Sequence, residues 1–487
     1  MKFLRKNILW IISVFSSSFL LLGLMYNTFV PTNFVYIIGA FAVLYMVLSG
    51  LKFSKIVKVI LILVLLVSSG FLFYTQYSAE KVIKYVPSET SIITFVVLKD
   101  SKITKIEEAA NAKFGATETM DALTETYLKD QLNTKISKYT WNSVTDDQSN
   151  MELLYSGGID VLVLDNSVRD YLIEIDPTFE TKTKIIWTVE KSSVKEVIVK
   201  EVDISKKPFI ILVSDIDITG PITLRSRSDV NIVMIVNPTT NKILTVSIPR
   251  DTYTPLGCKT GAYDKLTHSG IYGVNCTVKT IENLLGIDIN YYVRVNFSSL
   301  IKIINVVGNI DVYSQYSFTT EDGTHFNSGM NSLDSAKAQT FARARHQFES
   351  GDVQRGFNQQ EVIKGLINKL TSPSTLTKIE GIISATAKSV DTNMTTDDVS
   401  KLVKKQIGSN QPWAITTSNL NGVGDMKPTY SMGDRLLYVM HPNADSLAQI
   451  KKNIEEFMVI SKQSLMKIRI TTTFDFLQLA GGKVDAI

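Results

Sequence analysis

The chain has 487 residues, of which 51 are lysine or arginine and 47 are aspartate or glutamate, giving a formal net charge of +4 at pH 7. This near balance, without a basic run, argues against a general nucleic-acid-binding protein, so no nucleic acid partner is expected. About 410 residues follow the last hydrophobic stretch, which is enough for two or three domains.

Three hydrophobic stretches lie near the N-terminus, at Ile8–Met25, Phe34–Leu51 and Ile56–Tyr74. Each is about 18 residues or slightly longer and nearly free of charge, the length needed to cross about 30 Å of hydrocarbon. We therefore expect three transmembrane helices within residues 1–78. A cleaved signal peptide is the alternative for the first stretch, but it lacks a small-residue cleavage site and two further stretches follow it.

Positive charge is unevenly distributed around these stretches. The first connection, Asn27–Asn33, has no charge, whereas basic residues precede the first stretch and fill the second connection. These residues are Lys2, Arg5, Lys6, Lys52, Lys55 and Lys58. Cytoplasmic segments carry the excess of lysine and arginine. We expect a multi-pass protein of the cell membrane whose chain after Tyr77 is extracellular.

Residues 79–191 are expected to form a small accessory α/β domain. Strands are predicted at Ser91–Leu98 and Gly157–Leu164, with helices at Glu118–Ile136 and from Asn166. The sequence of this stretch has no glycine-rich phosphate loop, metal cluster or nucleophile pattern, so its role is left open. Asp160 and Asp165 are candidate ligands, although Asp165 is better explained as a helix cap.

Residues 208–460 are expected to form the main domain, followed by a C-terminal tail at 461–487. Predicted strands are Phe209–Val213, Val230–Val236, Ile243–Ile248, Tyr292–Asn296 and Ile310–Tyr313. Predicted helices are Thr277–Leu285, Ser298–Val307, Leu333–Phe341 and Val353–Leu370. Near-continuous apolar strands indicate a sheet covered on both faces. The expected fold class is α/β, a three-layer α/β/α sandwich with its ligand at the strand ends.

Arginines in this domain have the spacing of a phosphate site. Arg343 and Arg345 share one side of a short extended segment predicted at 342–347, and Arg355 and Gln359 share one face of the next helix. Ser350 to Asp352 supplies a turn and a cap, which puts Arg355 at a helix N-terminus that favours anions. The arginine fork binds two phosphate oxygens, so a cluster of three implies more than one phosphate. Surface ion pairing explains one such arginine, but poorly explains the set.

Aspartates occur beside further arginines at neighbouring strand ends. Arg250 and Asp251 follow one strand, and Arg227 and Asp229 lie on one side of the segment before another. Asp217 follows the first strand of the domain. Carboxylates at a phosphate site can hold Mg²⁺ against phosphate oxygens, or they can simply neutralise the arginines, and spacing leaves both open. Pairing of Cys258 with Cys276 is equally open.

The motifs together resemble the LytR-CpsA-Psr family. The runs Ser226–Thr252, Asp264–His268, Gly270–Gly273 and Tyr291–Phe297 carry the resemblance, together with Arg343, Arg345, Arg355, Gln359 and Gln360. They span about a third of the chain, Phe209–Leu370, as several motifs in order. The hydrophobic stretches and the additional α/β domain are most similar to the CpsA-type capsule branch.

The resemblance implies a phosphotransferase outside Gram-positive cells. It would attach a capsular or other cell-wall glycopolymer from an undecaprenyl-pyrophosphate carrier to peptidoglycan, with Mg²⁺ and with accompanying pyrophosphatase activity. The pyrophosphate would bind Arg227, Arg250, Lys265, Arg343, Arg345, Arg355 and Gln359. Arg250, Asp229 and Asp251 would be catalytic, and Asp229, Asp251 and Asp217 would hold the metal. The polyprenyl tail would lie in an apolar tunnel beside Val230–Val236 and Leu300–Val307.

One departure concerns the segment after the domain's first strand, where the family's usual glycine-rich run is replaced by Ser214–Asp217. The expected chemistry is attack of a peptidoglycan hydroxyl on the sugar-side phosphorus, which needs positioning and charge neutralisation but no serine or cysteine nucleophile. A non-enzymatic polyprenyl-phosphate binder that regulates chain length is one alternative. A transcriptional regulator is another, but it would need a cytoplasmic DNA-binding element.

Overall fold

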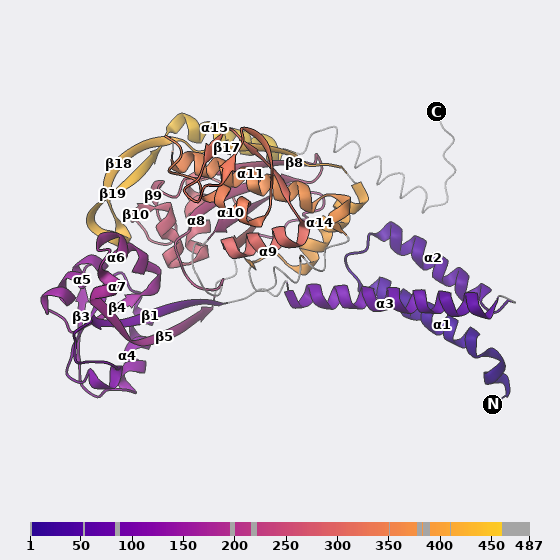
Figure 1. The fold of residues 1–487 in the computed structure, drawn as a ribbon, viewed down its shortest axis with the longest axis horizontal. Coiled ribbons are helices and arrows are strands. Elements are labelled where there is room, and N and C mark those ends of the chain that lie inside the picture. Colours follow the sequence, from indigo (N-terminus) through magenta and orange to yellow (C-terminus); the bar gives the residue numbers. More distant parts are fainter. Residues whose placement is uncertain are drawn as a thin grey trace.

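The computed structural model describes residues 2–51, 54–82, 88–194, 200–215, 222–349, 351–376, 382, 390–409 and 411–459. Figure 1 shows three parts in chain order: a group of helices at the N-terminus, a small α/β unit, and a larger α/β unit. The predicted tail at 461–487 and Asp217 lie outside the described residues. The division of the chain into domains at the expected boundaries stays a prediction.

The N-terminal part consists of helices α1 (Lys2–Tyr26), α2 (Thr32–Leu48) and α3 (Lys55–Val82). Two segments, Asn7–Tyr26 and Lys55–Tyr77, are long and apolar enough to cross a membrane. The middle helix is apolar but shorter, 17 residues, because it ends at Leu48 rather than at the expected Leu51. Many apolar side chains of all three helices are exposed. Such an apolar surface suits a bilayer rather than water, so the helices suggest membrane anchoring.

The small unit contains a five-stranded sheet of order β3-β2-β4-β1-β5. Its strands are β1 (Ser88–Leu98), β2 (Lys113–Thr117), β3 (Thr140–Val144), β4 (Val161–Asp165) and β5 (Thr183–Val194). Its helices are η1 (Ile106–Glu108), α4 (Ala122–Asn133), α5 (Asp147–Ser156), η2 (Asn166–Val168), α6 (Arg169–Ile175) and α7 (Phe179–Lys182). Strands β2, β3 and β4 are parallel, whereas β1 runs antiparallel to β4 and β5.

Two aspartates set helix starts in this unit. The predicted helix from Glu118 begins later, at Ala122, because the Asp121 carboxylate accepts the backbone N–H of Thr124 at 2.9 Å and caps it. Asp165 accepts the N–H of Ser167 at 2.9 Å, which confirms its interpretation as a cap. Strands β2, β3 and β5 were not predicted, because their short or mixed sequences lack a clear period.

The larger unit is built on a six-stranded mixed sheet of order β16-β11-β6-β7-β8-β17. These strands are β6 (Phe209–Asp215), β7 (Val230–Asn237), β8 (Lys242–Ser247), β11 (Tyr291–Val295), β16 (Val390–Thr392) and β17 (Ala414–Asn419). Shorter strands are β9 (Tyr253–Pro255), β10 (Tyr263–Lys265), β12 (Ile310–Ser314), β13 (Phe318–Thr319), β14 (His325–Phe326), β15 (Gly329–Leu333), β18 (Gly422–Thr429) and β19 (Gly433–Pro442). The predicted strand at Ile310 forms, but it pairs with β15 in a separate ribbon rather than joining the main sheet.

Helices cover both faces of the main sheet, as its apolar strands predicted. On one face, α8 and α15 pack against Leu212, Val233 and Leu244. On the other face, side chains of α11 and α14 pack against Ile211 and Ile232. The helices are η3 (Leu266–Tyr272), α8 (Val274–Leu285), α9 (Phe297–Val307), α10 (Ser335–Arg343), α11 (Asp352–Leu370), α12 (Pro373–Leu376), α14 (Thr396–Ser409), η4 (Tyr430–Met432) and α15 (Ala444–Met458).

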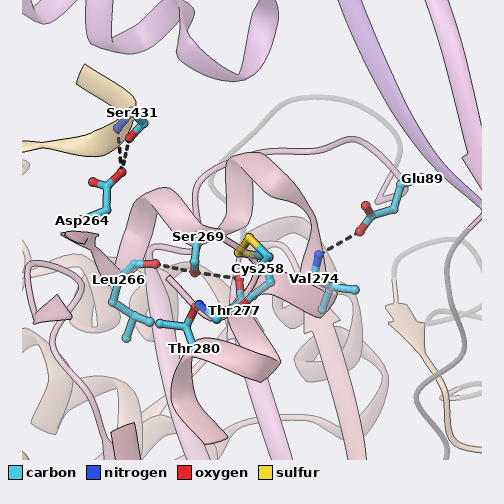
Figure 2. Close-up of a disulfide and its surroundings, with 11 residues drawn as sticks. Glu89, Cys258, Asp264, Leu266, Ser269, Val274, Thr277, Thr280 and Ser431 are labelled. Carbon is cyan, nitrogen blue, oxygen red and sulfur yellow. Dashed lines mark hydrogen bonds between the residues drawn. A yellow bond between two sulfur atoms is a disulfide. The ribbon is translucent and has the colours of Figure 1, made fainter. Parts of the chain in front are cut away.

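Cys258 and Cys276 form a disulfide across 18 residues. Spacing alone had left their pairing open. The bond joins the loop after β9 to the first turn of α8 (Figure 2). Disulfides persist in oxidising compartments, so the bond agrees with an extracellular position for this unit.

Candidate phosphate-binding site

The segment before β7 approaches the site in an extended conformation. Its burial alternates, so Ser226 and Ser228 are buried while Arg227 and Asp229 are half-buried on the other side. This is the arrangement predicted for Arg227 and Asp229. Gly270 allows η3 to pack closely on the segment, because a Cβ there would lie 2.4 Å from the carbonyl oxygen of Ser226.

Four of the expected site residues lie together at the strand ends. Arg250 Nη1 lies 2.7 Å from Asp229 Oδ1, and Arg250 Nε lies 4.0 Å from Asp251 Oδ1. Lys265 forms an ion pair with Asp251. All four side chains are largely buried but keep some exposure, so the cluster borders solvent. Alternating cations and carboxylates hold one another in fixed positions.

Two neighbouring groups that the sequence did not single out orient this cluster. The Thr267 hydroxyl donates to Asp229 Oδ1 at 3.0 Å, which leaves Arg250 and Thr267 on one carboxylate oxygen. Asp264, fully buried beside Lys265, accepts the N–H of Ser431 at 2.9 Å and lies 2.6 Å from His268 Nδ1. Figure 2 shows Asp264 facing Ser431 from the neighbouring segment. Because Ser431 is 167 residues away, only the folded chain reveals the partner.

The arginines after α10 adopt a different backbone from the one expected. Arg343 is the last residue of α10, not part of an extended segment, because the helix continues to the cap Ala344, whose N–H bonds Thr340. A basic residue suits a helix C-terminus, where the dipole is negative. Arg345 follows in an irregular turn. Together with Asp251 it lines a cavity of about 490 Å³, so Arg345 shares a cavity with the cluster.

Helix α11 presents Arg355 and Gln359 from its first turns, on one face as predicted. Its N-cap is Gly351, with a positive φ of 47° and no side-chain cap bond, and the cap expected from Ser350 to Asp352 stays a prediction that the described residues do not test. Ser350 lies outside them. The helix packs on α10 through the Asn358 amide, which donates to the Phe341 carbonyl at 3.3 Å. Of the other expected residues, Arg227 lies in the segment before β7, Arg343 ends α10, and Arg355 lies in the first turn of α11.

An apolar cavity of about 220 Å³ begins beside this site. Gln359, Asn296 and Asp215 are its polar lining residues, and aliphatic side chains from β6, β7, β11, β16, α9, α10 and α11 form the rest. Val230 and Leu300, from two segments expected to line a lipid tunnel, are among them. Asp215 was missed because β6 was expected to end at Val213.

A second apolar cavity, of about 490 Å³, continues the first. Val293, Ile303 and Val390 line both. The second cavity extends along α14 to Trp413 and to Phe29, which lies in the connection between α1 and α2. The connection also touches α14 directly, since the Ser400 hydroxyl donates to the Thr28 carbonyl. An apolar path therefore leads from the polar cluster to the N-terminal helices.

Asp229 and Asp251 are the described candidate ligands for Mg²⁺. Among the described residues there is no group of three or more His, Cys, Asp or Glu side chains placed to hold a metal ion. Asp229 and Asp251 lie on either side of Arg250, and each already contacts a cation. Mg²⁺ is commonly bound by one or two carboxylates together with substrate phosphates. The residues present fit that partial mode, in which the substrate supplies the remaining oxygens.

The site thus combines an arginine and carboxylate cluster at strand ends with an apolar cavity beside it. The model of the LytR_cpsA_psr family matches residues 178–455, which is more than half of the chain, and the chain belongs to this family.

Two named relatives agree with the family match. The Bacillus subtilis (strain 168) "polyisoprenyl-teichoic acid--peptidoglycan teichoic acid transferase TagU" is 34% identical over 278 residues, covering 57% of this chain and 86% of that protein. The Bacillus anthracis protein of the same name is 41% identical over 181 residues, 37% of this chain. The chain spans 59% of that relative's length. These relatives are named for teichoic acid, so they do not single out the CpsA branch.

Among solved structures, the crystal structure of B. subtilis TagU aligns with 53% of this chain and 99% of its own, at 32% identity and a TM-score of 0.42. That of B. subtilis TagV aligns with 52% of this chain and 98% of its own, at 30% identity and a TM-score of 0.44.

Proposed function

We propose that the protein is a transferase that moves a cell-wall glycopolymer from a polyprenyl-pyrophosphate carrier to peptidoglycan at the outer face of the membrane. The observation that carries this proposal is that Asp229, the partner of Arg250, directly precedes Val230 and donates its backbone N–H to Asp215, and both Val230 and Asp215 line the first of two apolar cavities that lead to the N-terminal helices. A polyprenyl pyrophosphate has both parts, an anionic head and a long apolar tail.

The cations in this region suit the pyrophosphate. Arg250 and Lys265 are held by the two aspartates, and Arg345 shares a cavity with Asp251. Guanidinium groups bind phosphate oxygens in pairs. The full set proposed for the head group is Arg227, Arg250, Lys265, Arg343, Arg345, Arg355 and Gln359.

In the proposed reaction, a peptidoglycan hydroxyl oxygen forms a bond to the sugar-side phosphorus, and the bond from that phosphorus to the bridging oxygen breaks. Polyprenyl phosphate leaves with the bonding electron pair. The hydroxyl proton passes to Asp229 or Asp251, whose carboxylates border Arg250. Arg250 stabilises the charge that spreads over the phosphate oxygens. Asp229 and Asp251, with Asp217, would hold Mg²⁺, which neutralises phosphate charge when bound.

The tail would occupy the two apolar cavities. Their far end reaches Phe29 in the α1–α2 connection, which the distribution of lysines predicts to be extracellular. The same rule places everything after α3 outside. The contact between Thr28 and Ser400 thus joins two segments expected on one side of the membrane, and it lets the tail enter from the outer leaflet.

The names of the relatives favour teichoic acid as the glycopolymer, whereas the accessory α/β domain led us to expect a capsular polymer. Both polymers reach the wall on polyprenyl pyrophosphate in this proposal, so the site itself does not distinguish them. A non-enzymatic lipid binder is the second candidate, because a site that only holds the head group needs the cations but no metal-binding aspartates.

Paired measurements on the full-length protein in detergent separate these functions. Polyprenyl-pyrophosphate-linked oligosaccharide and peptidoglycan are supplied with and without Mg²⁺, and transfer is followed beside lipid affinity. Asp229→Asn and Asp251→Asn should lower turnover more than affinity, because these groups matter most when charge redistributes in the transition state. Lys242→Ala, an exposed cation outside the site, is the control. Tight lipid binding by the wild-type protein without any transfer or hydrolysis would contradict the transferase and support the non-enzymatic lipid binder.

A further inference from the structure

A polar cleft of about 320 Å³ lies between the small α/β unit and the larger one. The small unit contributes Thr117, Asp121, Asp147 and Asp165 to its lining, and the larger unit contributes Arg225 and Tyr272. The cleft also reaches Cys258 and Ser431, so part of its wall is the region drawn in Figure 2. None of these residues belongs to the phosphate-binding cluster.

The topology of the small unit places this cleft where α/β sheets bind ligands. Strands β2, β3 and β4 are parallel. The chain passes from β2 to β3 on one side, whereas β4 lies on the other side of β2, so the direction in which the sheet is built changes between β2 and β4. Thr117 and Asp165 end the two strands on either side of that reversal, and both line the cleft. In open α/β sheets, ligands bind beyond the carboxyl ends of the strands at such a switch point.

Asp147 is an unsatisfied group in the cleft wall. Asp147 is 3% exposed, and its Oδ1 has no hydrogen-bond partner among the described residues. A buried acceptor without a partner costs free energy, so a native site is expected to satisfy it. Burial, together with the neighbouring carboxylates of Asp165 and Asp146, raises the pKa of Asp147 to about 7. A ligand hydroxyl that donates to Oδ1 would remove the deficit.

The charged residues of the cleft exclude two classes of ligand. Lys191 Nζ lies 3.7 Å from Asp121 and donates to Thr124 at 2.6 Å, and Arg225 Nε lies 3.2 Å from Glu89. The lining also includes Lys259, and its three basic residues face three acidic ones, Asp121, Asp147 and Asp165, so the cleft has no excess of positive charge for an anion such as phosphate. The described residues also lack a group of three metal ligands. A neutral polar ligand fits best.

Hydroxyl and apolar side chains alternate in the lining. Thr119 and Ser193 supply hydroxyls, while Met120, Leu123 and Ile271 supply apolar surface. A sugar ring presents hydroxyl groups at its edge and C–H groups on its faces, so it matches such a lining. Phosphate esters and free cations do not match this lining.

The cleft is also close to the proposed reaction centre. Helix η3 has Thr267 bonded to Asp229 near one end and Ile271 and Tyr272 in the cleft at the other. Five residues of 3₁₀-helix span about 10 Å. A glycan chain whose end lies at the phosphate cluster could therefore extend into the cleft.

We propose that this interdomain cleft binds a neutral saccharide unit of a glycan substrate, with Asp147 accepting a hydrogen bond from a sugar hydroxyl. The inference rests on the proposed transfer function for the identity of the glycan. It gives the small unit a role, holding the sugar chain while the phosphate cluster acts on its end.

The test is saccharide binding by the full-length protein in detergent, measured by saturation-transfer NMR and calorimetry. One arm uses soluble chito-oligosaccharides, neutral β-1,4-linked N-acetylglucosamine chains that stand in for the peptidoglycan glycan strand, and the other uses a phosphate-free oligosaccharide of the wall glycopolymer. Leu123→Trp places a bulky ring at the cleft from a position that is 79% exposed, so folding should be unaffected. Ile185→Trp, at a position of the same unit that is 46% exposed and outside the cleft lining, is the matched control.

We expect one oligosaccharide to bind the wild-type protein and the Ile185→Trp variant equally, and the Leu123→Trp variant at least tenfold more weakly. The arm that binds identifies the glycan as acceptor or donor. Arg250→Ala should retain this binding, because the phosphate cluster is a separate site. If neither oligosaccharide bound, if Leu123→Trp bound normally, or if Arg250→Ala abolished binding, the cleft proposal would be overturned. Normal binding without any transfer would instead overturn the proposed function alone.

Discussion

Glu89 Oε1 lies 3.4 Å from Arg294 Nη1, and both side chains are nearly buried. The pair joins β1 of the small unit to β11 of the main sheet. Glu89 also accepts the N–H of Val274 at 2.9 Å, where α8 begins (Figure 2). Gly273 makes room for this carboxylate, since a Cβ there would lie 2.3 Å from Oε2 and its φ is +97°. One carboxylate therefore fixes the small unit against the segments that lead into the site.

Glu89→Ala should destabilise the protein, because Arg225 and Arg294 each lose a carboxylate partner; Arg294 keeps Asp391 Oδ2 at 3.3 Å, so the cost should lie at or below the lower end of the usual range. Breaking one side of a buried ion pair typically costs about 3–5 kcal/mol. Chemical denaturation of the detergent-solubilised protein measures the loss. Glu107→Ala, which removes an exposed carboxylate 3.3 Å from Lys135, should leave the denaturation midpoint unchanged. Equal midpoints for both variants would show that the Glu89 contacts contribute little.

Arg250→Ala should reduce transfer about 100-fold or more, the usual effect of removing a donor that stabilises transition-state charge. Arg343→Ala and Arg355→Ala should act in the same direction if their guanidiniums reach the head group. Transfer rates of purified variants, measured beside Lys242→Ala as the control, provide the test. Wild-type rates in the Arg250 variant would remove this residue from the proposed site.

Asp147 should make stability depend on pH. Its folded pKa is raised from 3.8 to about 7, so the protonated form is favoured in the folded state. This contribution is fully present below pH 4 and is lost as the pH rises towards 7. Asp147→Asn should therefore stabilise the protein more at pH 8 than at pH 4, by about 4 kcal/mol at most. Denaturation midpoints of both proteins at the two pH values measure the difference, and a pH-independent difference would contradict the buried carboxyl.

Phe29→Asp should weaken the use of long-tailed substrates. Phe29 lines the far end of the apolar cavities, and a carboxylate there would have to be desolvated against the tail. The KM for a full-length polyprenyl substrate is expected to rise, whereas the KM for a substrate truncated to one or two isoprene units should stay the same because it does not reach this end. A comparable rise for both substrates would mean that the substitution acts on the fold.

Local sequence patterns predicted much of the fold. Apolar runs indicated β6, β7, β8 and β11, and helical periods indicated α8, α9 and α11. Strand ends then brought Asp229, Arg250 and Asp251 near one another, because the start of β7 and the end of the antiparallel β8 meet at one edge of the sheet. The distribution of lysines predicted the topology without any coordinates.

Other features depended on contacts between distant parts of the chain. No local pattern in the sequence predicts three of these contacts. They are the pairing of β12 with β15, the Cys258–Cys276 bond, and the hydrogen bond between Asp264 and Ser431. The start of α11 at Asp352 lies one residue before the expected Val353, but the positive φ of Gly351 that precedes it was not predicted.

The sequence by itself determined the class of chemistry, because arginines and aspartates at fixed offsets from apolar strands can serve few ligands other than phosphates. Only the tertiary structure decided which groups touch, that two apolar cavities share lining residues and reach Phe29, and that Asp147 lines an interdomain cleft with its Oδ1 unpartnered among the described residues. The physical reason is that the repeat with which side chains point to one face of a helix or strand is set by local backbone geometry, so it can be recognised in the sequence. Cavities and unsatisfied groups arise instead where separately folded surfaces meet.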